Sequence, residues 1–407
     1  MAFETAISGL NAATTQLDIA SNNIANVNTN GFKQSRAEFS DIYTGSNLGV
    51  SSLAVSRGVR TAAITQQFDQ GNIKSTNNNF DLAISGGGFF VLSDNGSQVY
   101  SRAGAFGVDR SGFVTNSAGQ KLMAFQVDAA GLPAGSPVEL QIDTSDVAPN
   151  ATCTIGVGIN LRAAAPVVTV TPFDPNVAGS YTNSSSMTFY DSLGGAHDGV
   201  LYFVKTAANT YDTHLLMDGV EIPPSASGTL TFGTDGKILT PATGQVAYTS
   251  TAVPGAANMA MTLDYAGATP TTQFGDTYSV NALDQNGYTT GRLATIQIDE
   301  TGQVFARYTN GQSRVQGVVA MANFANPQGL RQAGNNAWIE TFTSGVPLVG
   351  RGGSARLGTI QAGSLEDSNV NLTEELVKLI MAQRNFQANA QVIQTEDRVT
   401  QTLMNMR

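Results

Sequence analysis

Both ends of the chain carry apolar residues at a strict interval of seven, which is the spacing of a coiled-coil helix. Near the N-terminus the repeating positions are Phe3, Leu10, Leu17 and Ile24, followed three residues later by Ala6, Ala13, Ala20 and Val27. Near the C-terminus they are Leu365, Leu372, Leu379, Phe386 and Ile393. The sequence therefore predicts a helix with an apolar stripe at each end.

Each stripe needs a partner, because about 25 residues of helix are not stable alone in water. The partner is either the other terminal helix, closing an ordinary domain core, or a helix of another subunit. Alanines at positions 6, 13 and 20 permit close backbone approach, whereas a self-sufficient helix pair would carry larger side chains there. This favours assembly between copies. We expect the assembly seam to contain Phe3, Ile7, Leu10, Leu17, Ile24, Leu372, Leu376, Leu379, Phe386 and Ile393.

The composition limits the classes of function. A length of 407 residues with 41% hydrophobic content allows two to four domains with real cores. A net charge of −10 argues against nucleic acid or an anionic membrane surface as partner. The one cysteine, Cys153, excludes an internal disulfide framework and a cysteine-based metal site, and we expect it to be a small buried side chain.

The hydropathy of the chain and the charges near its N-terminus indicate where in the cell the protein is located. No stretch approaches the ~18 apolar residues of a membrane span, so we expect no membrane insertion. Glu4 lies near the N-terminus and the first basic residue is Lys33, so the basic region of a cleaved signal peptide is missing. By itself, the composition indicates a cytoplasmic protein.

Between the helices the sequence is typical of β-structure. The first helix should end in the Asn- and Gly-rich stretch 21–31, and residues 32–70 have weak periodicity, which predicts an irregular connector. Alternating apolar runs from residue 80 onward are separated by turn signals such as Asp94-Asn95-Gly96. Residues 128–149 are rich in Pro and Gly, which marks a boundary.

A second β-module follows this boundary. Residues 146–281 contain three basic and ten acidic residues, as suits a water-facing domain. After residue 281 the alternating apolar runs seen from residue 80 onward return. We therefore expect a mainly β protein with terminal α-helices. The expected domains are a helical coiled-coil domain (1–31 and 364–407), a connector (32–70), a discontinuous inner β domain (71–146 and 282–363) and an inserted outer β domain (147–281).

No catalytic, cofactor-binding or metal-binding site is expected. His197 and His214, with Asp191, Asp198 and abundant serine, could be imagined as a hydrolase triad, but no Gly-x-Ser-x-Gly elbow exists. The stretch 233–237 resembles a phosphate loop, yet isoleucine follows where Ser or Thr should bind magnesium, so a hairpin turn is predicted. The glycine run 86–88 indicates a bulge or a close approach of strands. A β-rich adhesin is an alternative that would leave the terminal heptads unexplained.

Several segments resemble the bacterial flagellar rod and hook proteins. At the ends these are Ser8-Gly9-Leu10-Asn11-Ala12-Ala13, Asn22-Asn23-Ile24-Ala25-Asn26, Asn30-Gly31-Phe32-Lys33, Ser364-Leu365-Glu366-Asp367-Ser368-Asn369-Val370-Asn371-Leu372 and Ala382-Gln383-Arg384-Asn385-Phe386-Gln387-Ala388-Asn389-Ala390. In between they include Gly88-Phe89-Phe90, Tyr100-Ser101-Arg102-Ala103-Gly104 and Val319-Ala320-Met321-Ala322-Asn323-Phe324. The resemblance spans the whole chain and is weakest in the outer module. Within this family the long insertion favours a hook over a distal rod component, which remains the alternative.

The resemblance implies a structural subunit without catalytic activity. It would self-assemble into the curved, flexible tube that acts as a universal joint between the flagellar motor and the filament. The partners implied are further copies of the chain, the rod and hook–filament junction proteins, and the hook cap during assembly. The location implied is the extracellular hook of the bacterial flagellum.

The resemblance also implies export through the flagellar type III gate, without a cleaved signal peptide. Early-exported subunits of this class share a Phe-x-x-x-hydrophobic motif. Phe39-Ser40-Asp41-Ile42-Tyr43 matches it, with Phe39 and Tyr43 at the two motif positions. The alternative for Phe39 is packing within the connector.

Overall fold

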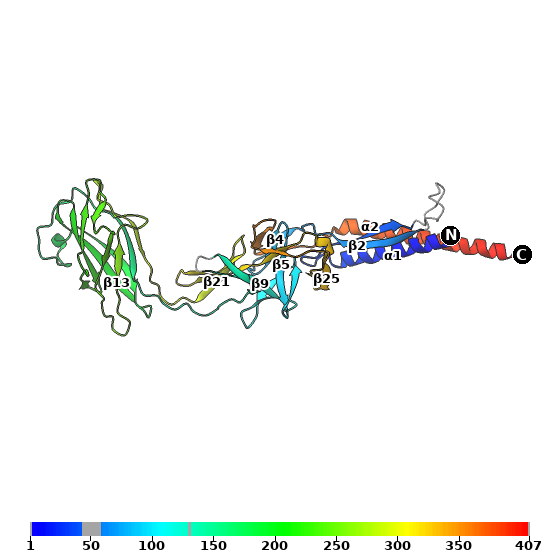
Figure 1. Ribbon diagram of the computed structural model, residues 1–407, viewed down its shortest axis with the longest axis horizontal. Coiled ribbons are helices and arrows are strands. Elements are labelled where there is room, and N and C mark those ends of the chain that lie inside the picture. Colours follow the sequence, from blue (N-terminus) through cyan, green and yellow to red (C-terminus); the bar gives the residue numbers. More distant parts are fainter. Residues whose placement is uncertain (1, 43–57, 129–131, 406–407) are drawn as a thin grey trace. The chain divides into compact units, whose positions relative to one another are not determined.

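The computed structural model describes residues 2–42, 58–128 and 132–405 (Figure 1). The fold is mainly β, with one helix at each end of the described chain, as predicted. The chain divides into two compact units. Unit 1 comprises residues 1–144, 295–307 and 313–407, and unit 2 comprises residues 145–294 and 308–312. No helix of the described part is long and apolar enough to cross a membrane.

The two helices of unit 1 are α1 (Ala2–Ala25) and α2 (Leu372–Asn405), which lie side by side (Figure 1). Helix α2 starts directly after the predicted Asn371, whose side-chain oxygen accepts the backbone N–H of Thr373 at 3.1 Å. The heptad position predicted at Leu365 is wrong, because this residue lies in strand β29 (Ser364–Glu366), before the cap. Glu374 and Glu375 follow in the first turn, where the helix dipole favours negative charge. The cap and the dipole together define the start of α2.

The remaining segments of unit 1 are strands and one short 3-10 helix. They are β1 (Ser35–Asp41), β2 (Val59–Gln66), β3 (Ile73–Ser75), β4 (Leu82–Ser85), β5 (Phe89–Asp94), β6 (Ser97–Ser101), β7 (Phe106–Val108), β8 (Val114–Asn116), β9 (Lys121–Val127), β10 (Pro133–Glu139), β21 (Leu293–Ile298), β22 (Gln303–Tyr308), β23 (Ser313–Val319), β24 (Met321–Asn323), η2 (Pro327–Gly329), β25 (Arg331–Gly334), β26 (Ala337–Ile339), β27 (Leu348–Gly350), β28 (Thr359–Ala362) and β29 (Ser364–Glu366). Strands β21 and β22 run across the limit between the two units.

The main sheet of unit 1 has 13 described strands, with the central order β21-β22-β23-β9-β5-β6-β26-β25. Side chains alternate across β5. Phe90 and Leu92 enter one apolar core, whereas Phe89 and Val91 enter a second. The sheet is therefore buried on both of its faces at this strand, which makes the inner β region a firm base for the helices.

The predicted irregular connector at residues 32–70 is wrong. It contains β1 and β2, which pair antiparallel from Ser35 opposite Gln66 to Asp41 opposite Val59 (Figure 1). The pairing is interrupted by a register shift between Glu38 and Phe39. The hairpin escapes periodicity because β1 and β2 are largely solvent-exposed, so neither shows a clean apolar alternation.

Unit 2 packs two sheets around one core. Its elements are β11 (Thr154–Asn160), η1 (Ala178–Ser180), β12 (Asn183–Tyr190), β13 (Ala196–Ala207), β14 (Thr210–Met217), β15 (Val220–Ile222), β16 (Thr229–Phe232), β17 (Ile238–Thr240), β18 (Gln245–Ala247), β19 (Thr262–Asp264) and β20 (Ser279–Gln285). One sheet has the order β12-β13-β14-β16-β17 and the other β18-β19-β11-β20. Alternate residues of β11 and β13, such as Val157 and Phe203, meet in the core.

The chain leaves unit 2 later than the predicted residue 282. Strand β20 pairs antiparallel with β11, with Leu283 opposite Val157, so residues 282–294 group with unit 2. The mixed burial of this strand does not distinguish it from the strands of the inner region. The other predicted domain limits stay predictions.

Two smaller expectations have opposite outcomes. The stretch 233–237 is a hairpin turn between β16 and β17, as predicted, with the backbone N–H of Gly233 donating to the Lys237 carbonyl at 2.8 Å.

Cys153 was predicted to be buried, and this is wrong, because its side chain is exposed. It precedes β11, outside the buried part of the strand, and its Sγ accepts a hydrogen bond from Asn286.

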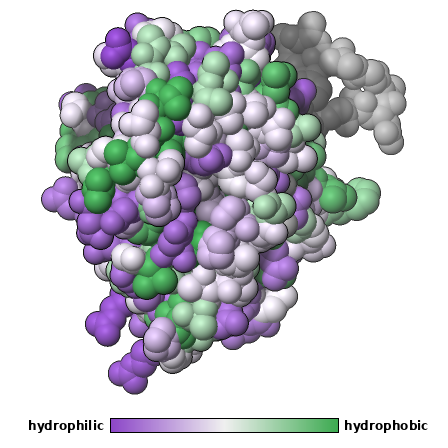
Figure 2. All heavy atoms as spheres, turned by 90° about the vertical axis from the view of Figure 1, so that its left-hand side faces the viewer, coloured by the Kyte–Doolittle hydropathy of each residue, from purple (hydrophilic) through white to green (hydrophobic). Residues whose placement is uncertain are grey.

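The surface of unit 2 mixes polar and apolar residues. Exposed apolar side chains include Leu193, Val220, Leu239 and Phe274. In the space-filling view, hydrophobic residues are interspersed with hydrophilic ones over the face shown (Figure 2). Single exposed apolar residues of this kind are normal on a protein surface.

Candidate assembly surface and its buried base

Helices α1 and α2 contact each other through small residues. Ala6, Ala13 and Ala20 of α1 and Ala382 of α2 are buried. At Gly9 a Cβ atom would lie only 2.7 Å from the Asn389 side-chain oxygen, so the Asn389 side chain packs directly over this glycine. The alanine positions of the predicted seam therefore pack within the chain, and a helix pair of the same chain exists.

The large residues of the seam are less buried than the small ones. Phe3 is 43% exposed, Ile7 38%, and Leu372 and Leu376 44% each. The half-buried members are Leu10, Leu17, Ile24, Leu379, Phe386 and Ile393. The intramolecular contact thus leaves much apolar surface of the seam in water.

Helix α2 also exposes apolar residues outside the predicted seam. They are Val377, Ile380, Met381, Val392, Val399 and Met404. These positions lie outside the repeat that contains Leu372, Leu379, Phe386 and Ile393, so a search for that one repeat misses them. A count of apolar residues around the whole helix would have found them, since a helix that is apolar on more than one side needs more than one partner.

Hydrogen bonds fix the hairpin β1–β2 to the base of the helices. The Asn23 side chain donates to the Ser35 carbonyl at 2.9 Å and accepts the Ser35 N–H at 2.9 Å. It also donates to Glu375 of α2 at 3.2 Å. Near the other end of α1, Ser8 Oγ accepts the backbone N–H of Val59 at 3.2 Å. One buried asparagine therefore links α1, β1 and α2.

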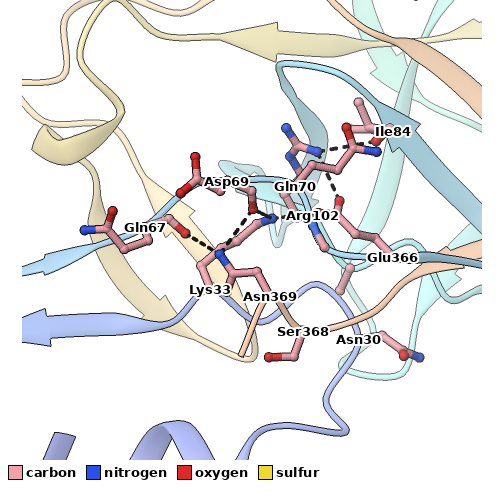
Figure 3. A network of polar contacts seen from close by, with 12 residues as sticks. Asn30, Lys33, Gln67, Asp69, Gln70, Ile84, Arg102, Glu366, Ser368 and Asn369 are labelled. Atoms are coloured by element: carbon pink, nitrogen blue, oxygen red, sulfur yellow. Dashed lines mark hydrogen bonds and ion pairs between the residues drawn. The ribbon is translucent and has the colours of Figure 1, made fainter. Parts of the chain in front are cut away.

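A buried ionic cluster lies where the chain passes between the helices and the β region (Figure 3). Glu366 Oε1 accepts Lys33 Nζ at 2.6 Å and the Gly71 N–H at 2.9 Å, while Oε2 accepts Arg102 Nη1 at 3.0 Å. The Lys33 and Glu366 side chains are fully buried and that of Arg102 is 4% exposed. Lys33 also donates to the Asp69 carbonyl at 2.7 Å. The carboxylate thus holds three separate segments of the chain.

The charges of this cluster are not balanced. Two cations face the one carboxylate of Glu366, and Arg102 also donates from Nη2 to the Gly86 carbonyl at 2.7 Å and lies 5.7 Å from the centre of the Phe89 ring. Burial lowers the pKa of Lys33, and the attraction of Glu366 offsets only part of that effect. Removal of the carboxylate would therefore leave two buried cations with only the weaker attraction of Asp69 for Lys33 as compensation.

Asn369 and Gly31 complete the cluster. Asn369 accepts the Gln34 N–H at 2.8 Å and donates to the Gln67 carbonyl at 2.8 Å. Gly31 has φ +67°, and a Cβ there would lie 2.5 Å from the Ala103 nitrogen. Three of the segments quoted above, 30–33, 100–104 and 364–372, meet at this place. The charged residues of these segments were the signal in the sequence, because only 13% of the residues in this chain are charged.

Both histidines of unit 2 contact carboxylates. His197 Nδ1 contacts Asp218 at 2.6 Å and Nε2 contacts Asp191 at 3.4 Å, so carboxylates occupy both ring nitrogens. The hydrogen bond to Asp218, helped by Asp191, raises the pKa of His197. His214 contacts Glu221 at 2.5 Å and stacks on Phe173. In the part of the chain that is described, no group of three or more His, Cys, Asp or Glu residues could hold a metal ion.

The export-gate hypothesis is only partly covered by the structure. Phe39 lies in β1 and is 38% exposed. Tyr43 lies outside the described residues. The exposed ring of Phe39 is accessible to a partner, whereas the second motif position has no structural description.

Comparison with known proteins places the chain in a family. Over its full length it is 40% identical to the flagellar hook protein FlgE of Salmonella typhimurium, with 100% of both chains covered. The chain belongs to the flagellar hook protein family. The hook protein of Escherichia coli K12 is also 40% identical at 100% coverage of both chains, and that of Borreliella burgdorferi is 31% identical at 98% of both.

Family models match successive parts of this flagellar hook protein. They are the flagella basal body rod protein (3–33), the hook protein FlgE/F/G D1 domain (83–161), the basal body protein FlaE D2 domain (160–288) and the FlgEFG C-terminal region (361–406). The crystal structure of the Helicobacter pylori hook protein FlgE2 is similar in fold, with a TM-score of 0.51 and 12% identity over 72% of this chain and 100% of that one. The protein is thus a structural subunit of the bacterial flagellar hook, the part of the flagellum to which its relatives belong.

Proposed function

We propose that this hook subunit polymerises through its terminal helices into a curved, flexible tube that transmits motor torque to the filament. The observation that carries the proposal is the division of α1 and α2 into two kinds of surface. Small residues pack within the chain, while Phe3, Ile7, Leu372 and Leu376 stay 38–44% exposed. Burial of such side chains against another copy is favourable by about 25 cal/mol per Å² of apolar surface.

The terminal helices and unit 2 would make different kinds of contact between copies, as a flexible joint requires. Continuous helix seams between neighbouring copies would hold the tube together. Residues 146–281 are acidic and carry only scattered apolar side chains on the surface, so contacts between copies of unit 2 would be weak enough to shift during rotation. A tube that bends without breaking needs both kinds of contact.

The partners of the tube follow from this role. We infer that its ends meet the flagellar rod and the hook–filament junction proteins, and that a hook cap covers the growing end. Phe39 and Tyr43 are proposed to engage the flagellar type III export gate. We propose no reaction for the chain, and neither nucleic acid nor a membrane as a partner.

The test is assembly of the full chain with and without a charge in the seam. Leu376→Asp should abolish the tubes seen by electron microscopy after concentration with a precipitating salt, because a carboxylate would enter a desolvated contact. Leu10→Asp and Leu379→Asp should act in the same way. The matched control is Gln383→Asp, at an exposed polar position of α2. Fluorescence of Trp338, buried in unit 1, reports whether the β region stays folded.

The outcomes separate the alternatives. Normal tubes from Leu376→Asp would contradict the proposed seam. Straight, rigid polymers from the unaltered chain would contradict the curved, flexible tube. Compact monomers under all conditions would mean that the helix pair merely closes an ordinary domain.

A further inference from the structure

A loop of unit 1 presents apolar side chains to solvent. Phe342 is 102% exposed, the highest value among the described large apolar residues. Val346 is 89% exposed, and Leu348 at the start of β27 is 53% exposed. β27 pairs with β24 alone among the described strands, so these side chains flank a sheet edge. We call residues 341–346 the knob loop.

The knob loop is held rigidly. Ser344 is fully buried, its Oγ accepting the Thr341 N–H at 2.9 Å and donating to the Thr341 carbonyl at 2.8 Å. Thr341 Oγ1 donates to the Gly329 carbonyl, and Asn326 donates to the Thr343 carbonyl at 3.0 Å. The backbone passes so close to Gly329 that a Cβ there would lie 2.5 Å from the Ser344 nitrogen. Phe342 is therefore preorganised in an outward position, which reduces the entropy lost on binding.

Unit 1 also contains a hollow with a partly apolar lining. Ile64, Phe68 and Leu330 line a cavity of about 440 Å³, and its other lining residues are polar: Ser35, Gln66, Gln328, Arg331 and Gln332. The Phe68 ring is fixed from behind by edge contacts with Phe89 and Trp338, at ring-centre distances of 5.5 and 5.6 Å. The volume is ample for a phenyl ring, and the aromatic floor suits edge-to-face contact.

A second cavity of about 320 Å³ fits a phenyl ring less well. Six amide side chains line it, against three in the first hollow: Asn22, Asn26, Gln66, Gln332, Asn335 and Asn336 here, and Gln66, Gln328 and Gln332 there. An apolar ring there would separate these amides from water without offering them hydrogen bonds, which is unfavourable. The hollow at Ile64, Phe68 and Leu330 is the better receptor.

Knob and hollow belong to the same unit, yet the exposure of Phe342 shows that they are not joined within one chain. Every copy thus carries one exposed knob and one receptor. If each copy gives its knob to one neighbour and its hollow to another, the contact is head-to-tail, and it generates an open helical polymer when the rotation does not close. This is the symmetry that a tube of the proposed kind needs.

We propose that Phe342 of one copy inserts into the hollow lined by Ile64, Phe68 and Leu330 of a neighbouring copy in the polymer. The proposal rests on the proposed function and adds to it a contact between β regions that is separate from the helix seam. A second copy is the occupant because the polymer supplies knobs and hollows in equal number and at high local concentration.

Mixed assembly tests the contact directly. Two full-length variants are made, Phe342→Cys and Ile64→Cys, each with Cys153→Ser and only the first with an affinity tag. After co-assembly and oxidation, we expect a disulfide-linked dimer of one tagged and one untagged chain on a non-reducing gel. A disulfide between these two chains is intermolecular by construction. The matched control replaces Ile64→Cys with Val220→Cys, which is 65% exposed in unit 2 and should give no such dimer.

A second measurement tests how much the Phe342 contact contributes to the free energy of polymerisation. Phe342→Ser should raise the protein concentration needed for polymerisation by about tenfold or more, as truncation of a central aromatic anchor does, with unchanged Trp338 fluorescence. Phe342→Leu should restore most of the loss.

The outcomes distinguish the knob contact from the helix seam. Normal polymers from the cysteine mixture without the tagged–untagged dimer overturn the knob contact and leave the helix seam standing. A polymerisation threshold of Phe342→Ser equal to that of the unaltered chain does the same. If the unaltered chain forms no polymer, the proposed function fails, and the knob contact falls with it.

Discussion

Lys33 Nζ and Glu366 Oε1 lie 2.6 Å apart, and both side chains are fully buried. The two residues are 333 positions apart in the sequence, one shortly after α1 and the other shortly before α2. Arg102 from the β region shares the same carboxylate. This contact fixes the bases of both terminal helices to one point of the β region, so the helix pair leaves the inner domain in a defined register.

Loss of the shared carboxylate should destabilise unit 1. Glu366→Gln removes the carboxylate that contacts both Lys33 and Arg102, so we expect the free energy of unfolding to fall by about 3–5 kcal/mol. Trp338 fluorescence during urea unfolding measures it. The control is Asp367→Asn, which removes the contact with Lys74, whose side chain is 73% exposed, and should cost less than about 1 kcal/mol. Equal effects of the two variants would contradict the role given to the cluster.

Gly31 should tolerate no side chain. Gly31→Ala adds a Cβ that would lie 2.5 Å from the Ala103 nitrogen at a residue with φ +67°. Gly119→Ala is the matched control, with φ +79° and no atom within 4 Å of the added Cβ. Gly119→Ala should cost about 1 kcal/mol from backbone strain alone, and Gly31→Ala clearly more. Urea unfolding midpoints compare them, and similar midpoints would mean that the backbones separate easily.

His197 should make the stability of unit 2 depend on pH. The hydrogen bond to Asp218 raises its pKa, so its contribution to stability is fully present below the unfolded pKa of about 6.5 and disappears as pH rises through the folded value. Titration of the histidine ring protons by NMR should give a pKa above about 6.5 for His197. Asp218→Asn should lower it. An unshifted pKa, or one insensitive to Asp218→Asn, would exclude this linkage.

The Cys153 thiol should react in the folded protein. Its side chain is exposed, beside Asn286. We expect one equivalent of a thiol reagent such as DTNB to react without denaturant, at a rate similar to that in urea. Cys153→Ser, which has no thiol, provides the blank. A reaction that requires denaturant would show that the thiol is shielded.

Local sequence patterns determined several elements. The interval of seven at both ends predicted α1 and α2, because the apolar residues of an amphipathic helix recur three and four positions apart. Asn371 predicted the start of α2, and the stretch 233–237 predicted a turn, since caps and turns depend on a few adjacent residues. Alternation and turn signals predicted the β-rich middle of the chain.

The tertiary structure decided what each element faces. The heptads did not reveal that alanines pack within the chain while the larger Phe3 and Leu376 stay exposed, because burial depends on the shape of the partner. The exposed hairpin β1–β2 carries no periodic signal. The contact of Lys33 with Glu366 and the outward position of Phe342 arise from segments far apart in the sequence, and only the folded chain brings such segments together.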